Sequence, residues 1–109
     1  MSHDRERIRV LNDELRQHLL GGGAVMTPGI ASLGPHAIAR LLQTISIFND
    51  FGESDDPHGE HDFAAFTFEG ADIIFKIDYY DRNLQYHSPD PSDSAVTERV
   101  ITIMLADEY

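Results

Sequence analysis

Apolar residues in the first part of the chain follow a helical spacing. Ile8, Leu11, Leu15 and Leu19 succeed one another at intervals of three or four residues, which places them on one stripe. This pattern predicts an amphipathic helix over residues 5–20.

The opposite side of this helix carries polar residues four positions apart, Arg9 with Asp13 and Asn12 with Arg16. Such pairs are typical of a solvated helix face. Three glycines at 21–23 end the helix, since glycine adopts the left-handed cap conformation without steric cost. No phosphate-binding pattern follows them, so we expect a cap and no anion site.

Residues 24–27 are expected to be extended, because Pro28 holds the preceding residue out of the helical region. A second helix is predicted to begin near Pro35, a residue that suits the first helical position, and to end at Asn49. Its apolar stripe consists of Ile38, Leu41, Leu42, Ile45 and Phe48.

The periodicity changes after a polar connection at residues 51–62. Residues 63–68 and 73–79 are aromatic and β-branched, and Glu69 and Gly70 lie between them, which predicts a β-hairpin. Alternate residues of its second strand should face opposite sides of the sheet. The set expected in the core is Ile73, Phe75, Ile77 and Tyr79, and the set expected to be mostly solvated is Ile74, Lys76, Asp78 and Tyr80.

Two prolines within residues 88–93 predict a loop, and the β-branched residues 96–105 predict a third long strand, with a helix as the alternative toward its end. We therefore expect an α+β fold, in which two amphipathic helices pack on a three- to four-stranded antiparallel sheet. Residues 1–109 should form a single domain, with a helical half at 1–49 and an acidic β half at 50–109.

Charge is divided unevenly between these halves. The chain of 109 residues has a formal net charge of -11 at pH 7. Residues 1–49 sum to about +1, and residues 50–109 sum to about -12. This balance disfavours direct binding to nucleic acid or to an anionic membrane.

The chain contains no cysteine, which excludes disulfides, thiolate metal sites and cysteine nucleophiles. No apolar run approaches the roughly 20 residues needed to span a bilayer. We expect a cytoplasmic protein without a bound cofactor.

The densest polar segment, residues 50–62, has two competing interpretations. A solvated loop whose carboxylates serve turns is one, and a metal site that would use Asp55, His58, Glu60 and His61, with Asp78 added in an enzyme, is the other. The spacing of these residues matches no known metal-binding template. Asp78, Tyr79, Tyr80 and Asp81 could do acid–base work with His87 or His61, or could simply bracket a strand end.

The remaining candidate for a functional site is the surface that the carboxylates form together. A broad negative face can imitate the phosphates of a duplex and dock on a basic, nucleic-acid-binding surface. The residues predicted to bind the partner in this way are Asp50, Glu53, Asp55, Asp56, Glu60, Asp62, Asp78 and Asp81. The alternative is that this charge only keeps the protein in solution.

Six blocks distributed over nearly the whole chain carry a family resemblance: residues 9–16, 26–30, 55–63, 76–81, 88–91 and 97–109. Through them the chain resembles a family of short acidic bacterial proteins of unknown function, which implies an accessory protein but assigns no activity to any residue. In size, charge and lack of motifs the chain is also similar to anti-CRISPR inhibitors.

The function predicted from these observations is that of a small non-enzymatic inhibitor, a DNA mimic of anti-CRISPR or other anti-defence type. Charge reversal at Asp55, Asp56 and Glu60 is expected to abolish binding without loss of stability. One alternative is the metal-dependent enzyme or regulator described above. The other is a structural homo-oligomer that uses the strand at residues 96–105 as an open edge, so the oligomeric state stays open.

Overall fold

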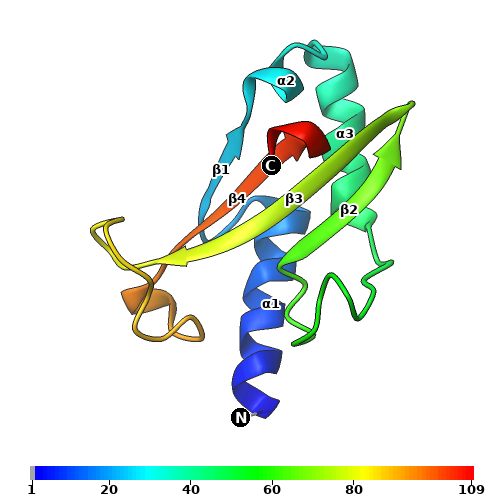
Figure 1. Cartoon of the computed structure of the whole chain (residues 1–109). Helices are drawn as coiled ribbons and strands as arrows, with labels where there is room; N and C mark the ends of the chain where they lie inside the picture. The colour runs from blue at the N-terminus through cyan, green and yellow to red at the C-terminus, as the bar shows by residue number, and fades with distance from the viewer. Residues whose placement is uncertain (1) are drawn as a thin grey trace.

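A single four-stranded sheet backed by helices forms the molecule (Figure 1). The structure is a computed structural model that describes residues 2–109. The helices are α1 (Ser2–His18), α2 (Pro28–Ala31) and α3 (Pro35–Ile47), and the strands are β1 (Gly23–Met26), β2 (Phe63–Phe68), β3 (Ala71–Tyr80) and β4 (Glu98–Leu105). α1 and α3 lie on the same face of the sheet, which we call the inner face (Figure 1). Among the described residues, no helix is long and apolar enough to cross a membrane.

The sheet has the order β1-β4-β3-β2 and is mixed, which corrects the expectation of a purely antiparallel sheet. β1 runs parallel to β4, with Gly23 opposite Val100 and Met26 opposite Ile103. A parallel neighbour requires a long connection, and the helix α3 and the β2–β3 hairpin both lie in the chain between these two strands. The four residues of β1 are too few for their pattern to indicate a direction.

The predicted hairpin is confirmed. β2 and β3 pair antiparallel, and Glu69 and Gly70 connect them with φ values of 49° and 84°. Positive φ at both central residues gives a two-residue turn whose twist matches that of the strands.

The core draws on both halves of the chain. Phe75 in β3 and Ile101 in β4 are almost completely buried, and Leu15 of α1 and Ile45 of α3 pack in the same cluster. The inner-face residues of β3 are buried as predicted.

Ile74 is an exception to the predicted solvated set, because only 8% of its surface is exposed. It pairs with Met104, which is also buried, on the outer face of the sheet. The C-terminal turn η2 (Ala106–Glu108) folds over this face in front of β3 (Figure 1), and the ring of Tyr109 lies 5.6 Å from that of Phe63. The helical alternative for the end of the third strand is thus correct only for this one turn.

β4 begins at Glu98, since Ser94–Val96 forms the short turn η1. It lies between β1 and β3, so the prediction of an open edge at residues 96–105 is wrong. The open edges of the sheet belong to β1 and β2.

The predicted solvated face of α1 is also wrong at two positions, because Asn12 and Arg16 are buried. Asn12 lies on the stripe of Ile8 and Leu15 that faces the sheet, and Arg16 lies at the border of this stripe, toward α3. Asn12 bonds to the backbone of Glu60, and Arg16 bonds to the end of α3. Because Asn12 comes four residues after Ile8 and three before Leu15, helical spacing places it on the apolar stripe, and its assignment to the opposite face is wrong.

Gly22 provides a test of how closely the end of α1 approaches β4. A Cβ atom on Gly22 would overlap the backbone carbonyl of Arg99, whereas one on Gly23 would meet nothing within 4 Å. We expect Gly22→Ala to lower the free energy of unfolding by about 1–3 kcal/mol. Gly23→Ala, the matched control, should change it by less than about 0.5 kcal/mol. Equal effects in urea denaturation would contradict the close approach.

Candidate functional site

A buried polar cluster, consisting of Asn12, Glu60, Tyr79 and Arg99, lies where α1 crosses the sheet. The Asn12 carboxamide is fully buried, and both its oxygen and its nitrogen form hydrogen bonds. Its oxygen accepts a hydrogen bond from Nε of Arg99 at 2.7 Å. Its nitrogen donates to the hydroxyl of Tyr79 at 2.8 Å and to the carbonyl of Glu60 at 3.0 Å.

Tyr79 continues the cluster toward the surface. Its hydroxyl donates to Oε1 of Glu60 at 2.9 Å. Burial, together with the charges of Asp62 and Glu60, raises the pKa of Tyr79 far above its ordinary value, so the phenol remains protonated and acts as a donor.

Arg99 is the charged centre of the cluster, with only 1% of its surface exposed. It makes no ion pair with any residue in the described part of the chain. Its Nη2 donates to the carbonyl of Pro91, and the guanidinium carbon lies 5.1 Å from the centre of the Tyr79 ring. Burial lowers the pKa of Arg99, and the nearby Tyr79 and Glu60 oppose this effect. A buried cation is tolerated here because polar groups surround it.

The acidic loop (residues 50–62) is held in shape by Asp56, which is buried. Its Oδ1 accepts hydrogen bonds from the backbone N–H groups of Glu60 and His61 at 2.9 and 3.1 Å. His61 itself has a φ of 58°. Asp56 therefore closes a tight turn, and its charge is used inside the loop.

His61 fastens the acidic loop to α1. Its Nδ1 lies 2.9 Å from Oδ1 of Asp13, and its ring stacks on Phe51 with centroids 4.0 Å apart. Asp13 also accepts from Arg16 at 2.8 Å, and Arg16 donates to the carbonyl of Phe48 at 2.8 Å. The loop is thus bonded to α1, and Arg16 bonds α1 to the end of α3.

Asp62 has the most perturbed carboxyl group of the loop. Partial burial raises the pKa of Asp62 from 3.8 to about 6, with smaller contributions from the charges of Glu60 and Asp56 that outweigh the opposing effect of His58. Asp62 therefore titrates close to neutral pH.

Seven of the eight predicted partner-binding residues divide into two groups, and the eighth, Asp62, is partly buried as described above. Asp50 and Glu53 are exposed, Asp55 is partly exposed, and none of the three has an ion-pair partner among the residues that the structure describes. The other group is engaged within the fold: Asp56 and Glu60 as above, Asp78 with Nζ of Lys76 at 2.5 Å, and Asp81 with the backbone N–H of Gln85 at 3.0 Å.

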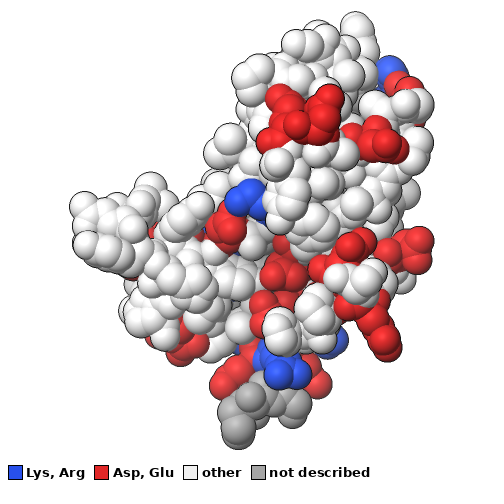
Figure 2. All heavy atoms as spheres, viewed as in Figure 1, with Lys and Arg blue, Asp and Glu red and all other residues white. Residues whose placement is uncertain are grey.

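Figure 2 shows the outer face of the molecule, with acidic side chains in several groups that neutral surface separates. One of these groups lies over the acidic loop. Few basic side chains interrupt them. The negative surface is therefore patchy on this face.

The residues proposed as metal ligands do not assemble. In the described part of the chain, no group of three or more histidine or acidic residues could hold a metal ion. His61 is engaged by Asp13, while His58 is exposed. Internal hydrogen bonds thus engage Glu60 and His61, two of the four residues that a cation would need.

The proposed acid–base group at residues 78–81 is also divided by the fold. Tyr79 faces the core and Tyr80 faces the outer side of the sheet. The ring of His87 meets that of Tyr79 edge-on at 6.2 Å, while its Nδ1 lies 2.9 Å from the carbonyl of Ser88.

Three residues of the site were missed from the sequence: Asn12, Arg16 and Arg99. A signal existed for Arg99, because it precedes Ile101 and Ile103 at the alternating positions of β4 that face the core. A signal existed for Asn12 too, since it lies between Ile8 and Leu15 on the apolar stripe of α1. Arg16 lies at the border of this stripe, and its burial depends on α3.

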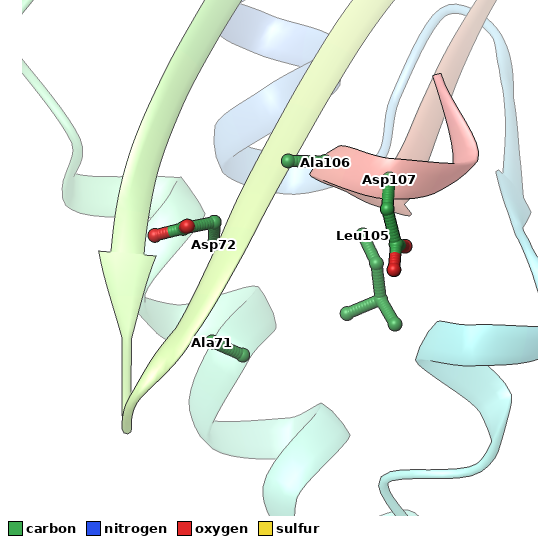
Figure 3. A pocket seen from close by; sticks show the side chains of 5 residues that line it. All are labelled: Ala71, Asp72, Leu105, Ala106 and Asp107. Atoms are coloured by element: carbon green, nitrogen blue, oxygen red, sulfur yellow. The ribbon is translucent and has the colours of Figure 1, made fainter.

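A hollow of about 320 Å³ lies at the other end of β3 and β4, lined by Ala71, Asp72, Leu105, Ala106 and Asp107 (Figure 3). Its two carboxylates do not converge on a common point (Figure 3). It lies away from the polar cluster, since Ala71 begins β3 and Tyr79 stands near its end.

Comparison with known proteins assigns the family. Residues 26–108 match the family model described as protein of unknown function (DUF3768). The chain belongs to this family. A search of curated proteins and a search of solved structures each gave no match. The matched region contains Glu60, Tyr79 and Arg99, whereas Asn12 lies before it.

Removing the carboxamide of Asn12 should expose how much the fold depends on the polar cluster. Asn12→Ala leaves Nε of Arg99 without its acceptor, and we expect the free energy of unfolding to fall by about 3 kcal/mol. Gln17→Ala, an exposed control on the same helix, should change it by less than about 0.5 kcal/mol. A small effect of Asn12→Ala in chemical denaturation would show that the cluster is not a structural centre.

Titration of Asp62 should affect stability in a defined pH range. Since the pKa of Asp62 is about 6 in the folded protein and lower in the unfolded chain, folding favours the protonated form. Raising the pH from about 4 to 6 should therefore destabilise the protein through this residue. Because Asp62 is only half-buried, we expect Asp62→Asn to stabilise the protein at pH 8 by about 1 kcal/mol.

The stabilisation by Asp62→Asn should decline from pH 8 toward pH 4 and disappear below about pH 3, where the carboxyl group of Asp62 is protonated in both the folded and the unfolded state. Glu53→Gln, at an exposed position of the same loop, provides the control and should show no such pH dependence. Thermal unfolding of the three proteins across this range measures the effect, and a constant difference between Asp62→Asn and the parent would contradict it.

Proposed function

We propose that this protein is a small non-enzymatic binding protein that docks its acidic side on a positively charged surface of a partner. The observation that carries the proposal is the acidic loop, whose fold leaves Asp50, Glu53 and Asp55 at the surface without cationic neighbours among the described residues. The partner that best fits such a surface is a nucleic-acid-binding protein, because its basic channel is built for phosphates.

The rigidity of the loop supports this function. Asp56 closes the loop from within, and Glu60 and His61 fasten it to Tyr79 and Asp13. Carboxylates on a fixed backbone lose less conformational freedom on binding than those on a mobile tail. The loop therefore presents its charges in one arrangement, as a mimic of a regular phosphate array needs.

The finer form of the proposal is an inhibitor that competes with DNA or RNA, of anti-CRISPR or other anti-defence type, acting in the cytoplasm. Its support is the charge of about -12 on residues 50–109, which would steer the protein toward a basic partner.

The structure changes which substitutions test this proposal. Charge reversal at Asp56 or Glu60 would break the loop's own hydrogen bonds, so at these two residues we now expect a loss of stability as well. Exposed positions avoid the problem.

We expect the triple variant Asp50→Asn, Glu53→Gln, Asp55→Asn to bind the partner roughly tenfold more weakly, since each exposed charge contributes a few tenths of a kcal/mol or more. The control variant Glu6→Gln, Glu14→Gln, Asp107→Asn has the same net charge but keeps the loop, and it should bind like the parent.

The partner would be captured from an extract of the native host on the immobilised parent protein, identified by mass spectrometry, purified and titrated by calorimetry. Binding should weaken with added salt and with a double-stranded DNA competitor. Equal loss in both triple variants would show that only net charge matters, and full binding by the loop variant would contradict the proposed surface.

A further inference from the structure

The β2 strand forms an open edge whose unpaired backbone groups can be identified. Ile77 donates its N–H to the carbonyl of Asp62 at 2.8 Å. In the register of this hairpin, hydrogen-bonded pairs alternate with non-bonded ones, so Ala64 and Phe66 bond to β3. The N–H and C=O groups of the residues between them point away from β3, namely those of Phe63, Ala65 and Thr67.

No other described segment accepts or donates to these outward groups. Ala65 and Thr67 are exposed, which agrees with a free edge. The outward groups therefore form a template for one further strand.

This edge lacks the features that usually prevent strand pairing. β2 has no charged residue and no proline in six positions, although 25% of the chain is charged. Its pairing with β3 is regular and contains no bulge. The opposite edge, β1, is protected by its length of only four residues.

We infer that β2 pairs antiparallel with β2 of a second copy of this chain, about a twofold axis at Ala65, to form a continuous eight-stranded sheet. This inference does not depend on the proposed function. The register that uses all three outward residues places Ala65 opposite Ala65 of the second copy and Phe63 opposite Thr67.

The side chains suit this register on both faces of the sheet. On the inner face Phe66 would lie opposite Ala64, and on the outer face Phe63 would lie opposite Thr67. A large residue thus meets a smaller one at each of these pairs, so that the rings have room to pack across the junction.

An ion pair lies at one end of the strand. Arg40 binds Glu69 at 2.7 Å beyond the Phe68 end of β2, and both side chains are about half exposed. Antiparallel pairing would carry Arg40 toward the acidic loop of the second copy, which precedes the Phe63 end of its β2. The guanidinium would approach the acidic loop together with the carboxylate of Glu69, so this end of the strand adds little net attraction.

The overall charge of -11 on each copy opposes association. Salt should screen this repulsion, so dimerisation is expected to strengthen as salt is added. Docking of the acidic side on a basic partner has the opposite dependence, and the two interactions can be told apart. Because one strand pair buries little area, we expect a dissociation constant in the micromolar range.

Sedimentation equilibrium at increasing protein concentration tests the inference. The mass should rise from 12.2 kDa toward twice that value, at lower concentration in high salt. Ala65→Lys would place two ammonium groups directly opposite each other and should weaken association at least tenfold. Ala39→Lys, at an exposed position of α3, is the matched control and should associate like the parent.

A single-cysteine variant gives an independent readout, because the chain has no cysteine. Under mild oxidation Ala65→Cys should form a disulfide-linked dimer much faster than Ala39→Cys. Circular dichroism checks that each variant is folded.

A mass that stays at 12.2 kDa at all salt concentrations would overturn the inference and leave the edge free for a strand of another protein. Dimers that form equally well with Ala65→Lys would overturn it as well, since a different surface would then be responsible.

Discussion

The hydrogen bonds of one buried carboxamide join the segments that build this protein. Asn12 connects α1 to Arg99 of β4, to Tyr79 of β3 and to the acidic loop at Glu60. The guanidinium of Arg99 could not remain in the interior without such polar partners, because desolvating a cation costs several kcal/mol. The position of α1 on the sheet, and that of the acidic loop on α1, follow from the need to satisfy this charge.

The acidic loop is consequently part of the folded structure rather than a solvated connection. Its carboxylates do different work according to their depth: Asp56 holds the backbone, Glu60 receives the Tyr79 hydroxyl, and Glu53 lies at the surface. The loop contains six acidic positions that look alike in the sequence, and the fold separates those that maintain the loop from those that can meet a partner.

Periodicity was sufficient to predict the α+β class, both long helices and the hairpin. Leu15, Ile45 and Phe75 each belong to an apolar series that has the spacing of a helix or a strand. It was insufficient where burial depends on a distant segment. Arg16, at the border of the apolar stripe of α1, is buried because the end of α3 docks on it. The direction of β1 was equally hidden, since its partner β4 comes more than seventy residues later.

The candidate site, too, could be predicted only in part. Residues 26–108 define the family, and the charged blocks within them were recognisable, yet the family description assigns no function. Which carboxylates are neutralised internally depends on hydrogen bonds such as that from Tyr79 to Glu60, which join residues 19 positions apart. A sequence pattern does not predict such a hydrogen bond.

The placement of β4 has a consequence for the way the chain reaches its native state. This strand is the last of the sheet to be synthesised, yet it occupies the middle, between β1 and β3. Until β4 pairs, β1 has no neighbouring strand, and the β3 edge of the hairpin is unpaired in addition to the β2 edge. Contacts that span nearly the whole chain, such as that of Asn12 with Arg99, form only at this step. This favours slow folding, in which the native sheet forms in one late step. A nascent chain interrupted before Glu98 would display unpaired strands and an apolar inner face, features by which cellular quality control recognises incomplete proteins.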